Sequence, residues 1–188
     1  VNFGDKVAVI ANRTWNAMKG KKALKANWKN PEILEDSEFH KNKLNELLDS
    51  NQFKSLRKDG DVEKAFSEAD KVIEKNYESP FLPHNCLEPM NFFADVTDKK
   101  INLVGPIQTP ERAANEVAKL LNRDIKEINV KMTRIGGGFG RRLIPDFVVE
   151  AADISNRIKK PVKLVYSRED DMAVGMYRPA IHYRIAAS

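Results

Sequence analysis

The sequence predicts a mixed α/β fold. Short β-branched runs alternate with segments whose apolar residues recur at helical spacing, a pattern typical of strands joined by helices. One such succession comprises a strand at 101–104, a helix at 110–121 and a strand at 125–132, and a connection of this length favours parallel pairing of the two strands. The composition agrees, because 41% hydrophobic and 31% charged residues are typical of a globular protein.

The N-terminal third is expected to hold a strand and a helix, followed by a polar segment with little to bury. Lys6 to Ala11 is a β-branched run that predicts a strand, and Asn12 to Trp28 has helical spacing, with Thr14 placed to cap the helix. Residues 31–60 are polar and predict a helical surface connector. We therefore expect three parts, which are residues 1–30, the connector 31–60 and a larger domain over 61–188.

The larger part is expected to alternate strands with helices. A short helix at 61–69 and a strand at 71–79 come first. Thr109 and Pro110 provide the cap and first residue of a later helix. The other predicted elements are strands at 92–96 and 101–104 with a turn at 98–100, helices at 110–121 and 146–158, strands at 125–132, 162–166 and 182–186, and a capped helix start at 167–170.

A glycine run between Arg134 and Arg142 is the most distinctive stretch. Gly136, Gly137 and Gly138 carry no Cβ, so their backbone can take positive φ and bring N–H groups close to a ligand. The spacing of a phosphate-binding P-loop is absent, and Arg141 stands where the dinucleotide fingerprint needs its last glycine. Because loops that follow parallel strands meet at one sheet edge, this run is expected to lie beside the loop of Gln108.

Other chemistry-bearing residues are sparse. The single cysteine, Cys86, excludes an internal disulfide and a cysteine metal cluster, and His40, His84 and His182 have no metal-ligand spacing. Glu88 is either a catalytic acid or a carboxylate that binds turn amides. The net charge of +5 comes from dispersed lysines, which favours a solvated face over nucleic-acid binding, and no apolar run approaches the roughly 20 residues of a membrane span.

Several segments, in order, resemble the large subunit of the molybdenum hydroxylases, the xanthine dehydrogenase and aldehyde oxidase family. They are Val7–Trp28, Leu87-Glu88-Pro89, Gln108, Gly137-Gly138-Phe139-Gly140 and Pro161–Met172. The run Gly-Gly-Gly-Phe-Gly-Arg-Arg, together with residues 84–91, is most similar to the isoquinoline 1-oxidoreductase beta subunit and bacterial aldehyde oxidoreductase branch. The resemblance implies the end of an α/β hammerhead domain, over residues 1–30, followed by the N-terminal part of a molybdopterin-binding domain over 61–188.

The resemblance also implies residue roles. Gln108 would donate a hydrogen bond to the apical oxo group of molybdenum, and no side chain would bind the metal directly. Leu143 stands where xanthine dehydrogenases have a substrate-binding glutamate, which implies an aldehyde or N-heteroaromatic substrate rather than a purine. The catalytic glutamate of the family is not among these residues. Arg142 would meet cofactor phosphates or form a surface ion pair, as would Arg141. The implied cofactor-binding residues are Gly137, Gly138, Phe139, Gly140 and Arg141.

The resemblance implies that the chain is a fragment of a molybdenum-dependent oxidoreductase, which hydroxylates its substrate with water as the oxygen source. The implied cofactor is molybdopterin, in its cytosine dinucleotide form, and an iron–sulfur subunit would carry a [2Fe–2S] cluster. We expect the fragment alone to be inactive. Two alternatives stay open, a non-catalytic binding module that uses the glycine loop and a thiol enzyme that uses Cys86. The compartment is left open between cytoplasm and periplasm.

Overall fold

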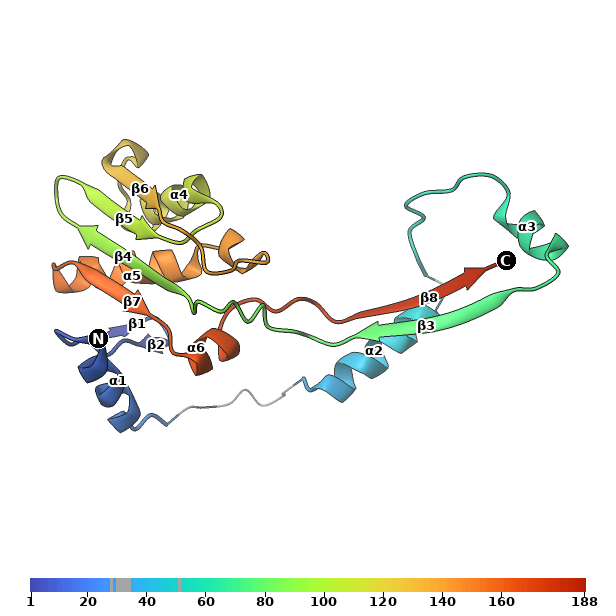
Figure 1. The fold of residues 1–188 in the computed structure, drawn as a ribbon, viewed down its shortest axis with the longest axis horizontal. Helices are drawn as coiled ribbons and strands as arrows, with labels where there is room; N and C mark the ends of the chain where they lie inside the picture. Colours follow the sequence, from blue (N-terminus) through green and yellow to red (C-terminus); the bar gives the residue numbers. More distant parts are fainter. Residues whose placement is uncertain (28, 30–34, 51) are drawn as a thin grey trace. The chain divides into compact units, whose positions relative to one another are not determined.

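The computed structural model describes residues 1–27, 29, 35–50 and 52–188. It divides into two compact units, one of Val1–Asn27 with Pro83–Met176 and the other of Trp28–Leu82 with Tyr177–Ser188 (Figure 1). The mixed α/β class is confirmed. The boundaries at residues 30 and 60 stay a prediction, and Trp28, the predicted end of the first helix, lies outside the described residues.

The first unit is built on a four-stranded sheet with the strand order β6-β5-β4-β7. The antiparallel strand β4 (Asn91–Val96) lies between β5 (Ile101–Gly105) and β7 (Val162–Val165). As predicted, β5 pairs in parallel with β6 (Ile128–Met132). The connection between them contains α4 (Pro110–Leu121), which packs with α5 (Asp146–Ile158) against the sheet (Figure 1). Parallel pairing therefore places the ends of β5 and β6 at the same sheet edge.

Alternation along the strands decides which side chains form the core. On β4, Phe92, Ala94 and Val96 are buried, while the residues between them are only partly so. They pack against the apolar faces of α4 and α5, and burial of each large side chain contributes about 1.5–3 kcal/mol. The other fully buried apolar members of this cluster are Cys86, Met90, Ile101, Leu103, Ile107, Ala113, Val117, Phe147, Val148, Ala151 and Ala152.

Four sequence predictions about where elements begin and end, or how they are capped, are wrong. The predicted strand 6–11 is only β2 (Lys6–Val7), paired with β1 (Asn2–Phe3). The helix predicted at 12–28 is α1 (Thr14–Ala23), none of whose residues is buried, so no packing extends it. Thr14 lies inside that helix and Arg13 at its N-cap, with no side-chain cap. Before β6, the Asp124 side chain accepts from Lys126 N and favours a 3-10 turn, Ile125–Glu127, over strand.

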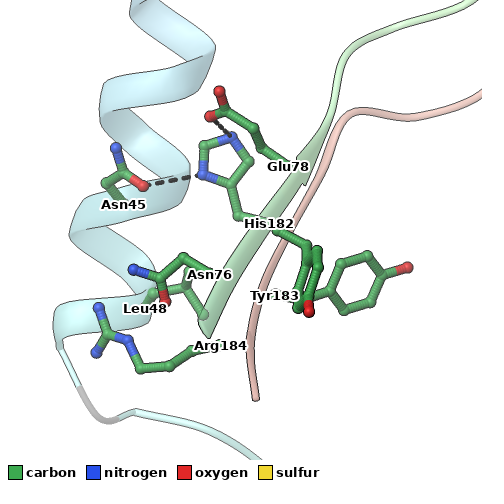
Figure 2. A pocket seen from close by; sticks show the side chains of 8 residues that line it. Asn45, Leu48, Asn76, Glu78, His182, Tyr183 and Arg184 are labelled. Atoms are coloured by element: carbon green, nitrogen blue, oxygen red, sulfur yellow. Dashed lines mark hydrogen bonds and ion pairs between the residues drawn. The ribbon is translucent and has the colours of Figure 1, made fainter. Parts of the chain in front are cut away.

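The second unit is a helix packed on a two-stranded ribbon. As predicted, helices form in the connector and after it, namely α2 (Ser37–Asp49) and α3 (Val62–Glu68). The ribbon pairs β3 (Ile73–Ser79) with β8 (Ile181–Ala187) in antiparallel register. Figure 2 shows that His182 lies between Asn45 of α2 and Glu78 of β3, with its Nδ1 2.9 Å from Asn45 Oδ1. Polar side chains therefore join α2 to the ribbon.

Candidate functional site

The loops that follow β5 and β6 meet at the sheet edge. Gln108 N donates to Arg142 O at 3.1 Å, and Thr133 N donates to Gly105 O at 3.1 Å. Thr109 was expected to cap α4, but it makes no side-chain cap, because its Oγ1 donates to Leu143 O at 2.9 Å. The hydroxyl thus joins the two loops instead of stabilising the helix end. The predicted meeting of the Gln108 loop and the glycine run is confirmed.

Gly138 lies directly against the Gln108 side chain. A Cβ added to Gly138 would be 2.7 Å from Gln108 Oε1 and 2.8 Å from its Cδ, closer than real Cβ contacts come. Gln108 is itself exposed, so its amide is available to a ligand as well as to the loop. The absent side chain at Gly138 is therefore what lets the Gln108 amide lie on the loop backbone.

The backbone of the glycine loop takes positive φ at three of four successive residues. The φ values are 101° at Gly137, 52° at Phe139 and 99° at Gly140. For Phe139 this costs on the order of 1 kcal/mol, and its side chain remains 67% exposed. The loop amides of Gly137, Gly138, Phe139 and Gly140 donate to no acceptor within the described part of the chain. A row of such N–H dipoles can bind an anionic or oxo group.

Glu88 binds the first glycine of the loop. Gly136 N donates to Glu88 Oε2 at 2.9 Å, and Glu88 N donates back to Gly136 O at 3.1 Å. A Cβ on Gly136 would be 2.5 Å from Glu88 Cβ, so the two backbones can approach only because this residue is glycine. Of the two roles that the sequence left open for Glu88, the geometry supports binding of turn amides.

Both arginines after the loop are buried, so the expectation of surface ion pairs is wrong. Arg141 donates to both carboxylate oxygens of Asp146, at 2.7 and 2.8 Å. Burial alone would lower the pKa of Arg141, but these bonds and the Asp146 charge raise it above its ordinary value. Its Nε has no hydrogen-bond partner among the described residues, and its cofactor role stays a prediction. Burial lowers the pKa of Arg142, whose charge is partly stabilised by Glu88.

Cys86 is a packing residue rather than an accessible nucleophile. The side chain is fully buried, and its Sγ donates to Gly138 O at 3.4 Å. Burial raises the pKa of the thiol, and the nearby Arg142 charge opposes this only in part. Since the thiolate is the reactive form, this environment argues against the thiol-enzyme alternative.

A further arginine supports the segment that carries Cys86 and Glu88, and the sequence analysis missed it. Arg168 donates to Leu87 O at 2.9 Å and to Asn85 Oδ1 at 3.0 Å. It lies in the first turn of α6 (Arg168–Ala173), whose predicted capped start is confirmed as a capping box between Ser167 and Asp170. The capping box predicts the helix start but not these contacts, because Asn85 and Leu87 lie 83 and 81 residues away in the sequence.

The family of molybdopterin cofactor-binding domains matches residues 40–188, which include both loops. The chain belongs to this family. The resemblance seen in the sequence is thereby confirmed at the family level. The chain is 30% identical over 175 residues to a membrane-bound aldehyde dehydrogenase [pyrroloquinoline-quinone] of Gluconacetobacter polyoxogenes, covering 92% of this chain and 23% of that protein. It is 32% identical over 140 residues to a xanthine dehydrogenase of Dictyostelium discoideum, covering 71% and 10%.

Two more similarities concern a shorter stretch and the fold. Over 62 residues the chain is 42% identical to the isoquinoline 1-oxidoreductase subunit beta of Brevundimonas diminuta, covering 33% of this chain and 8% of that one. The solved aldehyde oxidoreductase of Desulfovibrio gigas superposes with a TM-score of 0.60 at 20% identity, over 68% of this chain and 14% of that one, and shares the fold. The chain thus spans a minor part of the relatives' length.

The structure brings most of the predicted site residues to one sheet edge. Gln108 lies on Gly138, and the carbonyl of Leu143, a residue that is 43% exposed, accepts from Thr109 of the Gln108 loop.

Within the described ranges, no cluster of three or more His, Cys, Asp or Glu could hold a metal ion, and no helix is long and apolar enough to cross a membrane. A separate cavity of about 280 Å³ in the second unit, lined by Asn45, Glu78 and His182 among others, contains none of the predicted residues (Figure 2).

Proposed function

We propose that this chain is the part of a molybdenum-dependent oxidoreductase that holds the molybdopterin cofactor between the glycine loop and the Gln108 loop. The observation that carries the proposal is the cradle at Gly138. There, the lack of a Cβ lets the exposed Gln108 amide lie on a backbone whose neighbouring N–H groups have no acceptor in the described chain. Family membership supports the identity of the cofactor.

The residues present fit such a group. Molybdopterin brings its own sulfur ligands, which suits a chain with one buried cysteine and no described cluster of metal-binding side chains. The Gln108 amide would donate to the cofactor, and the amides from Gly137 to Gly140 would act as fixed donors near developing negative charge. When bound, the cofactor supplies two-electron oxidation of an electron-poor carbon with water as the oxygen source.

The substrate class follows from Leu143 and from the relatives. An apolar, partly exposed side chain at this position suits an aldehyde or an N-heteroaromatic ring better than a purine that needs a carboxylate partner. Relatives named as aldehyde dehydrogenase, isoquinoline 1-oxidoreductase and nicotinate dehydrogenase support the same classes, whereas the xanthine dehydrogenase relative does not, so the choice depends on Leu143. We also propose the cytosine dinucleotide form of the cofactor, a [2Fe–2S] partner subunit, and residues 1–30 as the end of a hammerhead domain.

The test is elemental and pterin analysis of the full-length protein that contains this chain, purified with any subunits that copurify. The expected result is about one molybdenum and one pterin for each copy of the chain. Iron in a copurifying subunit would support the proposed partner subunit with a [2Fe–2S] cluster. A protein with neither molybdenum nor pterin contradicts the proposal, and a bound quinone in their place would favour the cofactor named for the Gluconacetobacter relative.

A second measurement concerns the 188 residues alone. Because the implied catalytic glutamate is not among them, the isolated chain should not oxidise aldehydes. Measurable aldehyde oxidation by the isolated chain would contradict the division of roles proposed above.

A further inference from the structure

We propose that Arg142 is a positioning residue that turns the amides of the glycine loop toward the cofactor. The inference rests on the proposed function, but it concerns a side chain that touches only protein. Arg142 is fully buried, and its guanidinium binds three segments that are far apart in the sequence. These segments are the glycine loop, the loop before Gln108 and the turn that contains Glu88.

The bonds of Arg142 define this arrangement. Nε donates to Gly137 O at 2.7 Å and Nη1 to Pro106 O at 3.3 Å. Nη2 donates to Glu88 O at 2.8 Å and to Glu88 Oε2 at 3.1 Å. The Arg142 carbonyl also accepts from Gln108 N at 3.1 Å. A planar guanidinium with five donors can serve all these acceptors together, whereas a lysine ammonium has three.

The orientation of the loop amides follows from peptide geometry. None of the peptide bonds in the described part of the chain is cis, so the carbonyl and the N–H of each of these peptide units point in opposite directions. Arg142 binds Gly137 O, which turns the N–H of Gly138 away from the buried guanidinium. Arg142 also binds Glu88, whose N–H donates to Gly136 O and so turns the N–H of Gly137 away from Glu88.

The next peptide unit is held in a similar manner by neighbouring groups. Gly138 O accepts from Arg141 N at 2.8 Å and from Cys86 Sγ, so the Phe139 N–H points away from them. Three successive carbonyls are thus bound by protein donors, while their three partner amides have no acceptor in the described chain. Arg142 takes part in two of these three contacts, because it binds Gly137 O directly and also binds Glu88, whose N–H donates to Gly136 O.

Arg141 is the internal comparison. It is almost as buried as Arg142, yet its guanidinium donates to Asp146, five residues along the same segment. Arg142 instead reaches Pro106 and Glu88, which are 36 and 54 residues away. Only the second arginine therefore holds the two loops in register.

The experiment uses the full-length protein and the variants Arg142→Met and Arg142→Lys. Ile101→Ala is the matched control, because Ile101 is fully buried at the other end of β5 and its truncation destabilises the sheet without touching the loops. The readouts are molybdenum and pterin content per folded protein, and, after cofactor removal, hydrogen exchange of the loop amides that donate to protein acceptors, namely those of Gly136, Arg141 and Leu143. Thermal unfolding of each variant gives the loss of stability for comparison.

Arg142→Met should reduce cofactor content at least about tenfold and speed loop exchange by a similar factor, while exchange in α5 stays near that of the wild type. Arg142→Lys should restore part of both. The control should lose stability but keep its cofactor content and loop exchange. If Arg142→Met does not fold, Glu88→Gln and Arg142→Lys take its place, with partial loss of loop protection expected.

Two results would overturn the inference. One is wild-type cofactor content and wild-type loop exchange in Arg142→Met. The other is an equal loss of both in Ile101→Ala, which would make the effect one of stability alone. A wild-type protein without molybdenum and pterin would refute the proposed function and the cofactor role of Arg142. In that case the loop exchange still decides whether Arg142 orients the loop.

Discussion

Replacement of Gly138 by alanine should affect catalytic turnover much more than it affects the stability of the protein. The added Cβ would lie 2.7 Å from Gln108 Oε1, so the Gln108 side chain has to move. Its end is exposed, and turning a χ angle about 30° away from its rotamer to make room costs about 0.5–1.5 kcal/mol. Loss of one preorganised donor to a reacting group lowers kcat by about 10²–10³, which corresponds to about 2.7–4 kcal/mol. We therefore expect a nearly unchanged unfolding temperature and a large loss of turnover.

The assay measures unfolding temperature, cofactor content and aldehyde turnover for the full-length protein and its variants. A double-mutant cycle with Gln108→Ala removes the group that the new methyl would displace. In that background Gly138→Ala should have little further effect on turnover. Two outcomes would refute the reasoning, namely wild-type turnover in Gly138→Ala, or equal effects of Gly138→Ala with and without Gln108.

Three other predictions concern stability and reactivity. Gly105→Ala should lower the free energy of unfolding by about 1–3 kcal/mol, because the added Cβ would lie 2.4 Å from the buried Phe92 ring. Urea unfolding of the variant and the wild type measures this difference. Although burial raises the pKa of Asp170, the bonds from Lys21 and Ser167 lower it below its ordinary value. Its stabilisation of α6 is therefore present near neutral pH and lost as pH falls through that lowered pKa, and Lys21→Met should weaken this acid dependence of α6 hydrogen-exchange protection. Equal protection in both proteins at every pH would contradict it. Cys86 should resist alkylation until the protein unfolds, as followed by mass spectrometry, and rapid native labelling would refute its assignment as a packing residue.

Periodicity in the sequence was enough to predict the core elements. Helix 110–121 and helix 146–158 have the predicted bounds, because each carries a clear apolar stripe and a proline at or just before its start. The parallel pairing of β5 with β6 followed from the length of their connection. At the N-terminus the same kind of pattern failed, since α1 has no buried residue and local propensity alone decided its length.

The site was predictable in position but not in its internal bonds. The glycine spacing and Gln108 indicated the two loops, and parallel topology placed them together. The roles of Arg141 and Arg142 were not predictable, because adjacent residues of one type differ here only in which distant segments they reach. Arg142 donates to Glu88, which is 54 residues away in the sequence, and a local sequence pattern cannot predict a contact between residues so far apart.

The central claim is that the amides of the glycine loop bind the cofactor. Hydrogen exchange of residues 134–143 in the full-length protein, with the cofactor bound and after its removal, tests this most directly. The account predicts that the amides of Gly137, Gly138, Phe139 and Gly140, which have no acceptor in the described chain, exchange at least about tenfold more slowly when the cofactor is bound. Equal exchange of this loop in the two states would contradict it.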